Sequence, residues 1–359
     1  MTDLNVSSWK AARDLLERPT YLVVIETIVL AVIFVISTTG NIFSCFIMYT
    51  SPRLRTWHNL LLLNVIFVDL MAIVLCVPFG VVVLITGRWI FGNALCSVVA
   101  YVSCLLLTVS IITLAAISIS RYFLITSLLR YMNVFRKQNI TWMIILIWSF
   151  AALCAFPPFL GWGDFLFLPG NAMCFIFFGS NLFYAAVFTL LVIGLPVFVI
   201  IACFVRVKLL IEMNKRMKSF TSVTSIASEE IDSAKTLFSV VIMVLLCWFP
   251  ILLLFLLAAV GIEMPRQASL MSTYSIFLPC ALKPVIYFCM KRQFRTGFRA
   301  ILNKLLPDVY KRRRRNRVAH KSIIIDCAVN RQTSRIHSER HDQFKLKHES
   351  AEFEETRNI

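Results

Sequence analysis

Seven stretches of this 359-residue sequence are long and apolar enough to cross a lipid bilayer. A spanning helix needs about 20 apolar residues. In hydrocarbon every backbone polar group must also be satisfied within the segment, which favours helices. Barrel strands would be half as long and would alternate in polarity. We therefore expect an all-α membrane protein, a seven-transmembrane helix bundle whose spans cover about residues 21–49, 60–85, 95–125, 140–160, 182–205, 237–260 and 268–290.

The composition supports lipid as the solvent for much of the chain. Residues are 59% hydrophobic and only 15% charged, more apolar surface than a soluble domain could bury. The net charge of +17 would suggest nucleic acid in a soluble protein, but 18 of the 36 lysines and arginines follow residue 290. That location favours a membrane surface or an acidic partner and argues against nucleic acid. No metal-ligand spacing, nucleophile–base pair or phosphate loop appears, so we expect neither a metal site nor an enzyme.

Basic residues gather in the connections after the first, third and fifth stretches, which places those connections in the cytosol. We therefore expect an extracellular N-terminus over residues 1–20, a membrane domain over 21–290 and a cytoplasmic C-terminus. The first twenty residues are not a secretory signal peptide. Asn5 begins an Asn-Val-Ser glycosylation acceptor, and such triplets also arise by chance.

The chain beyond the seventh stretch is basic. Residues 291–306 carry apolar side chains at helical spacing against a basic face, which predicts a short amphipathic eighth helix along the inner leaflet. The cationic run at 311–317 is either a site for anionic lipid or a solvated flank. Residues 307–359 are polar, and we expect a disordered cytoplasmic tail with serines and threonines available to kinases.

Polar groups inside a membrane are costly, so each one is a candidate functional residue. Asp69 and Lys283 lie at similar depths near the middle of their spans, and an ion pair would neutralise both. The alternative is that Lys283 extends to the inner interface. The polar residues within the spans are Asn41, Asn64, Asp69, Ser103, Ser110 and Lys283, with Glu26 near the outer end of the first.

The third stretch is predicted to be the axis of the bundle. Cys96 and Arg121 are 25 residues apart, about 38 Å along a helix, which places them in opposite interfaces with no charge between. Cys174 lies in a long aromatic outer loop, and the spacing alone leaves a disulfide with Cys96 open. Prolines in the last three stretches, at 196, 250 and 284, predict kinks that would let the cytosolic end change shape.

These residues resemble the rhodopsin-like class of G-protein-coupled receptors over about residues 21–305. The resemblance rests on residues typical of the family, which occur in the family's order along the chain, about one set per helix. They are Gly40-Asn41, Asp69, Trp89 with Phe91-Gly92, Cys96, Arg121-Tyr122, Trp148, Cys174, Pro196, Cys247-Trp248-Phe249-Pro250, Pro284-Val285-Ile286-Tyr287 and Phe294. Opsins and melatonin-type receptors look nearest within the class.

The resemblance implies a plasma-membrane receptor that binds a ligand outside and activates a heterotrimeric G protein inside. It implies that arrestin and receptor kinases bind the tail, and that Cys96 and Cys174 form a disulfide. Arg121 would contact the G protein, with Glu230 as its restraining partner. Trp248, which shares a helical turn with Pro250, would be the toggle switch below the ligand. Tyr287 would swing inward on activation.

Two departures from the family pattern are informative. The acid that usually precedes the arginine is Ser120 here, so restraint of Arg121 falls to Glu230, which predicts raised basal signalling. The last helix carries Lys283 where an asparagine or aspartate is usual. In relatives a sodium ion often lies beside the residues matching Asp69 and Ser110, and the Lys283 ammonium would replace it.

For the ligand the resemblance gives mainly exclusions. Ser103 stands where amine receptors carry an aspartate, which argues against a biogenic amine. Phe277 stands where opsins carry the retinal lysine, which argues against covalent retinal as a cofactor. A small-molecule, lipid or peptide ligand remains open. The expected pocket is largely apolar, and the same residues would serve equally as helix packing: Phe79, Ser103, Cys104, Leu107, Phe188, Trp248, Ile251, Phe255, Thr273 and Phe277.

Two alternatives to a ligand-activated G-protein-coupled receptor stay open at this stage. One is an atypical opsin-like receptor without retinal. The other is a transporter or channel that uses Asp69 and Lys283 as an ion or proton relay. It explains the charges within the membrane, but it leaves the ordered series of family-typical residues to coincidence.

Overall fold

The computed structural model describes residues 2–51, 54, 59–177, 181–217, 235–236, 238–251, 253, 265–291 and 294–299. Within these ranges six helices are long and apolar enough to cross a membrane. The sixth predicted stretch, 237–260, is described only in part and contains the shorter apolar helix Phe238–Ile251. The predicted helical membrane fold is confirmed.

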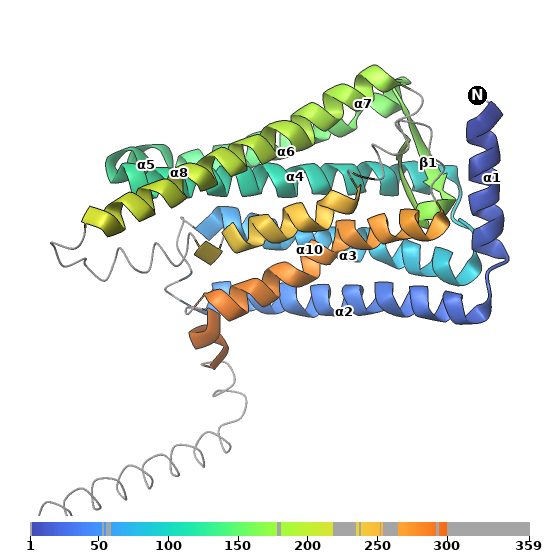
Figure 1. Cartoon of the computed structure of the whole chain (residues 1–359), viewed down its shortest axis with the longest axis horizontal. Coiled ribbons are helices and arrows are strands. Elements are labelled where there is room, and N and C mark those ends of the chain that lie inside the picture. Colours follow the sequence, from blue (N-terminus) through green and yellow to red (C-terminus); the bar gives the residue numbers. More distant parts are fainter. Residues whose placement is uncertain are drawn as a thin grey trace, which may run out of the picture. The chain divides into compact units, whose positions relative to one another are not determined.

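The spanning helices run alongside one another (Figure 1). In the fourth stretch the α-helix ends at Ala155, because Pro157 and Pro158 have no N–H to continue the ladder, and η2 carries the span on to Leu160. The helical elements are α1 (Thr2–Leu16), α2 (Thr20–Thr50), α3 (Leu60–Thr86), α4 (Asn93–Thr126), α5 (Leu128–Val134), α6 (Lys137–Ala155), η2 (Pro157–Leu160), α7 (Leu182–Phe188), η5 (Thr189–Gly194), α8 (Leu195–Met217) and α10 (Arg266–Met290).

The helices α3, α4 and α10 form the centre of the bundle. In their most apolar windows 56%, 61% and 56% of the residues are buried, against 22% in α2, in α6 and in the α7–α8 helix. The outer helices expose large apolar side chains such as Ile28, Val32, Trp142, Leu146 and Phe198. Such a surface suits contact with lipid, because exposing apolar side chains to water is unfavourable and exposing them to hydrocarbon is not.

A β-hairpin lies beside one end of α4. Strand β1 (Asp164–Leu168) pairs antiparallel with β2 (Met173–Phe177), and the turn between them is η3 (Pro169–Asn171). Both strands contact α4. This hairpin was not predicted, since its aromatic residues read equally well as an irregular outer loop.

Proline positions shape two of the helices as the sequence indicated. Pro284 in α10 leaves the carbonyl of Cys280 without its usual helical donor. The side-chain amide of Asn41 in α2 donates to that oxygen at 2.9 Å. Ahead of Pro196, η5 is a π-helix, and Leu195 N–H donates to the oxygen of Leu190, five residues back.

The N-terminal segment contains a helix about which no prediction was made from the sequence. Residues 2–16 form α1, and the side chain of Leu15 is fully buried among residues of the bundle. Asn5 lies on this helix, and its side chain is outside the described residues. Of the predicted eighth helix, residues 294–299 are helical. The other predicted residues after Lys291, including the whole tail from 307, lie outside the described part.

The α2–α10 contact yields a test of helix packing. A Cβ added at Gly40 would lie 2.9 Å from the Cβ of Pro284, which is held in a rigid ring. We expect Gly40→Ala to cost about 1–3 kcal/mol of stability by overpacking, more than the helix propensity it gains. Thermal unfolding of the purified protein in detergent measures this.

Gly194→Ala is the matched control, because the nearest atom there is Leu190 Cδ1 at an ordinary 3.4 Å. If Gly40→Ala were as stable as Gly194→Ala, the close approach would be wrong.

Candidate functional site

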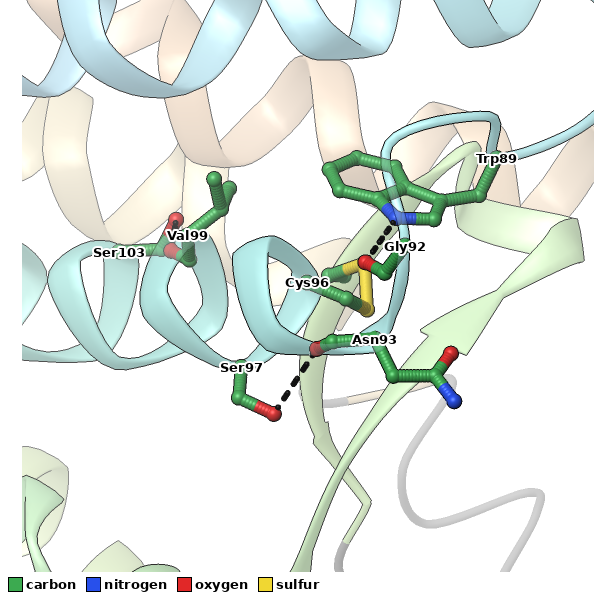
Figure 2. The surroundings of a disulfide bond; sticks show 8 residues. Trp89, Gly92, Asn93, Cys96, Ser97, Val99 and Ser103 are labelled. Atoms are coloured by element: carbon green, nitrogen blue, oxygen red, sulfur yellow. Dashed lines mark hydrogen bonds between the residues drawn. A yellow bond between two sulfur atoms is a disulfide. The ribbon is translucent and has the colours of Figure 1, made fainter.

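A disulfide fastens the hairpin to the first turn of α4. Cys96 and Cys174 are bonded, with their Cα atoms 5.4 Å apart, and both are buried. Trp89 covers the bond and donates from Nε1 to the oxygen of Gly92 at 2.8 Å, which holds the preceding loop against the helix (Figure 2). The pairing implied by the family resemblance is therefore confirmed, where spacing alone could not decide it.

A buried ion pair joins α3 to α10 halfway along the bundle. The ammonium of Lys283 lies 2.7 Å from Oδ1 of Asp69 and donates to Oγ of Ser110 in α4 at 3.0 Å. Lys283 is 2% exposed and Asp69 is 1% exposed. The predicted ion pair is confirmed, and the alternative in which Lys283 reaches the interface is wrong for this structure. The pair costs less than either charge alone because each neutralises the other.

A small cavity adjoins this ion pair. It has about 20 Å³ available to the centre of a water-sized molecule, room for about one such molecule. Its polar lining comes from Asp69, Ser110 and Lys283, and Trp248 forms part of the apolar lining. The second carboxylate oxygen of Asp69 is buried without a hydrogen-bond partner among the described residues.

A second buried polar contact joins α3, α4 and α6. The amide of Asn64 donates to Oγ1 of Thr113 at 3.0 Å, and Nε1 of Trp148 donates to Oδ1 of Asn64 at 3.0 Å. Together with Asn41 and Lys283, these bonds connect α2, α3, α4, α6 and α10. Most of the polar residues singled out in the spans therefore act as cross-links between helices, whereas Ser103 bonds within α4.

The opposite end of α4 carries Ser120, Arg121 and Tyr122. The hydroxyl of Ser120 is buried and donates to the oxygen of Ile117 at 2.9 Å, within its own helix. Tyr122 packs beside a cluster of Val207 and Phe238, so this end of α4 meets α8 and the helix Phe238–Ile251. Glu230, the expected partner of Arg121, lies outside the described residues.

Tyr287 is buried near the C-terminal end of α10. It is fully buried, and its ring centroid lies 5.8 Å from that of Phe294. The Lys291 ammonium lies 5.7 Å from the Tyr287 ring centroid. The Tyr287 hydroxyl has no hydrogen-bond partner among the residues that the structure describes. A buried hydroxyl without a partner is costly, so this side chain gains by any movement that supplies one.

The predicted pocket residues that the structure describes lie in several parts of the bundle, and the pocket itself stays a prediction. Leu107 and Trp248 line the small cavity, whereas Cys104 and Phe188 pack in one buried cluster and Phe277 in another. The remaining four are placed as follows: Phe79 packs on Trp89 and Phe91, Ser103 bonds Val99, Thr273 bonds Asn171, and Ile251 is half-buried. Phe255 lies outside the described part.

Residues 40–287 match the family model described as 7 transmembrane receptor (rhodopsin family). This match covers more than two thirds of the chain and includes the disulfide, the ion pair and Tyr287. The chain belongs to the rhodopsin family of seven-transmembrane receptors. Such G-protein-coupled receptors are signalling proteins of the plasma membrane that cross it several times, and they are not enzymes.

The relatives of this rhodopsin-family receptor carry the names of different receptors. It is 26% identical to the human histamine H2 receptor over 285 residues, which cover 77% of this chain and 78% of that one. It is 40% identical to the RYamide receptor of Tribolium castaneum over 127 residues, 35% of this chain and 34% of that one. The fold resembles squid rhodopsin with a TM-score of 0.68 at 22% identity, covering 81% of this chain and 87% of that chain.

Sequence reasoning missed the partners of Glu26 in this receptor. Arg266 at the start of α10 donates to both carboxylate oxygens of Glu26, and Arg18 lies 3.2 Å from one of them. The Tyr274 hydroxyl donates to the backbone oxygen of Glu26 at 2.9 Å. A signal was present, because a buried glutamate at the outer end of one span needs a cation at the same depth.

The Asp69–Lys283 pair predicts a strong coupling between the two residues. Either Asp69→Asn or Lys283→Met leaves one charge buried without its partner, and we expect each to cost about 3–5 kcal/mol. The double variant removes both charges and should recover most of the loss. Unfolding of the four purified proteins in detergent, compared as a double-mutant cycle, gives the coupling free energy.

Ser110→Ala serves as the control, since it removes one hydrogen bond from Lys283 and leaves both charges paired. Costs that simply add in the double variant would contradict a direct pair.

Proposed function

We propose that this protein binds an extracellular ligand and passes the signal to a heterotrimeric G protein in the cytosol. The observation that carries the proposal is the geometry of α4. One end is bonded to the β-hairpin through Cys96, and the other packs Tyr122 against α8 and the helix Phe238–Ile251. A single rigid element therefore contacts both ends of the bundle and the central ion pair between them.

The proposed orientation places the hairpin outside and the Ser120–Tyr122 end inside. Arg130, Arg136 and Lys137 lie in and after α5, which follows α4 at the end away from the disulfide. Cytoplasmic connections carry an excess of such basic residues. The oxidised Cys96–Cys174 pair suits the extracellular side.

The proposed ligand is an apolar small molecule, a lipid or a peptide rather than a biogenic amine. Although histamine H2 and adrenergic receptors are among the relatives, α4 carries Ser103 instead of a carboxylate at the expected amine position. The Ser103 hydroxyl donates to the oxygen of Val99 in its own helix at 2.8 Å. Covalent retinal is not proposed, because Phe277 supplies no amine. Arrestin and receptor kinases are proposed partners of the tail.

The missing acid before Arg121 predicts measurable ligand-free signalling. Ser120 bonds its own helix and has no charge, so it does not supply the neighbouring acid, and the proposed restraining carboxylate for Arg121 is Glu230. We expect Ser120→Asp to lower ligand-free guanine-nucleotide exchange, because a carboxylate beside the guanidinium favours the resting state by charge attraction. Exchange is measured for a panel of G proteins with full-length receptor in nanodiscs.

Ser120→Asn is the matched control, since it adds the same bulk without the charge. The proposed function would be contradicted if wild type gave no more nucleotide exchange than empty nanodiscs for every G protein, both without ligand and with each screened ligand. Equal ligand-free exchange in wild type, Ser120→Asp and Ser120→Asn would contradict only the proposed role of Ser120.

The Lys283 ammonium predicts a receptor that does not respond to sodium. It lies between the oxygens of Asp69 and Ser110, where a cation would bind, so sodium should not raise the melting temperature of wild type. Lys283→Asn leaves both oxygens available. We expect sodium to stabilise this variant by about 1.4 kcal/mol at ten times its Kd.

Melting curves in sodium chloride and in N-methylglucamine chloride at equal ionic strength measure the effect. Lys283→Asn with Asp69→Asn is the control that should lose the sodium response. An equal response in wild type and Lys283→Asn would refute the replacement of sodium by lysine.

A further inference from the structure

The N-terminal helix α1 lies across the end of the bundle that carries the hairpin (Figure 1). Within residues 9–16, whose side chains are described, the buried contact lies at the C-terminal end of α1. Leu15 is fully buried, whereas its neighbour Leu16 is 63% exposed and Trp9 is 74% exposed. Leu15 packs in a cluster that includes Val83 and Leu84 of α3. Among the described side chains of α1, residues 9–16, Leu15 is the buried one, and it anchors the end of the helix.

Arg18 adds a polar latch just after α1. Its side chain is 3% exposed and donates to the backbone oxygens of Leu15 and Leu84, which ties α1 to α3. Its Nε lies 3.2 Å from the Glu26 carboxylate. Burial lowers the pKa of the Arg18 guanidinium, and Glu26 opposes this shift. Since Arg266 also binds Glu26, that carboxylate keeps a partner even if Arg18 moves away.

The turn after α3 is shaped to receive α1. Gly87 has a φ of +71°, a conformation that favours glycine, and an added Cβ would lie 3.2 Å from the Cα of Leu16. The end of α1 thus rests directly on the backbone of this turn. A side chain at residue 87 would hold the two elements apart.

The elements under α1 lead to the predicted ligand region. α1 contacts η3 of the hairpin. From η3 the Asn171 amide donates to the oxygen of Ser269 at 3.0 Å, and the Thr273 hydroxyl donates to the Asn171 oxygen at 2.9 Å. Phe277 belongs to the same buried cluster as Leu15. Removing α1 would therefore uncover the layer directly above two of the predicted pocket residues.

We propose that α1 is a lid over the α3–α10 side of the outer end of the bundle, with Leu15 as its anchor and Arg18 as its latch. Access from this end requires the lid to leave. A segment with few buried contacts opens locally at a far lower free energy than global unfolding, so opening does not disturb the bundle. The link to ligand entry rests on the proposed receptor function, whereas the lid itself does not.

The lid is tested by the protection of a cysteine placed beneath Leu15. Val83→Cys introduces a thiol at a fully buried site in the Leu15 cluster with little change in shape. Full-length protein in nanodiscs is treated with a charged, water-soluble thiol reagent. Peptide mass spectrometry follows labelling at residue 83, with the exposed Cys289 as internal reference.

Two neighbouring leucines provide the matched pair of variants. In the Val83→Cys background, Leu15→Asp should speed labelling at residue 83 by about tenfold or more, because labelling of a protected group follows the open population. Leu16→Asp places the same charge one residue later, on a side chain that is 63% exposed and touches only the edge of the Gly87 turn, and should raise the rate far less. Arg18→Gln should raise the rate by a smaller factor, since it removes the latch and keeps the anchor.

Equal labelling in the Leu15→Asp and Leu16→Asp proteins would overturn the lid. So would labelling of residue 83 as fast as Cys289 before any change in α1. If Leu15→Asp does not fold, Leu15→Ala and Arg18→Gln carry the same comparison against Leu16→Ala. Neither ligand nor G protein enters the assay, so its failure would leave the receptor function standing, and failure of nucleotide exchange would leave the lid standing.

Discussion

A charge inside a bilayer must be neutralised within the protein, and the pairing of Lys283 with Asp69 meets that requirement at the centre of this bundle. The two charges come from α10 and α3, and Ser110 of α4 accepts a further bond from the ammonium. Because these are also the three most buried helices, the pair joins the elements that all others pack around. Helix positions elsewhere must be compatible with this one contact.

The same requirement explains the other cross-links in the membrane. Pro284 leaves a carbonyl without its helical donor, and the Asn41 amide supplies one from α2. Gly40 permits that approach because any larger residue would strike the proline ring. Backbone flexibility at a proline is thus combined with a fixed neighbour. Such a combination allows α10 to bend without leaving a backbone group unsatisfied.

Much of the fold could be predicted from residue patterns, and part of the site as well. Six of the apolar stretches matched the spans to within five residues, and the sixth stretch in chain order is described only in part. Asp69 and Lys283 were paired because few charges lie within the spans and depth limits the choice. The ligand pocket stays a prediction, since the positions of its residues depend on how α1, η3 and α10 pack. No periodicity in the sequence encodes that packing.

The sequence by itself determined that the chain crosses a membrane as helices, because lipid offers no partner to an unpaired backbone group. It also determined which charges needed neutralising there. Only the tertiary structure decided the partners: Arg18 and Arg266 on Glu26, Asn41 on the carbonyl freed by Pro284, and the cluster around Val83 and Leu84 that receives Leu15 of α1. These contacts join residues up to 240 positions apart. Their geometry follows from helix packing, which the local sequence does not specify.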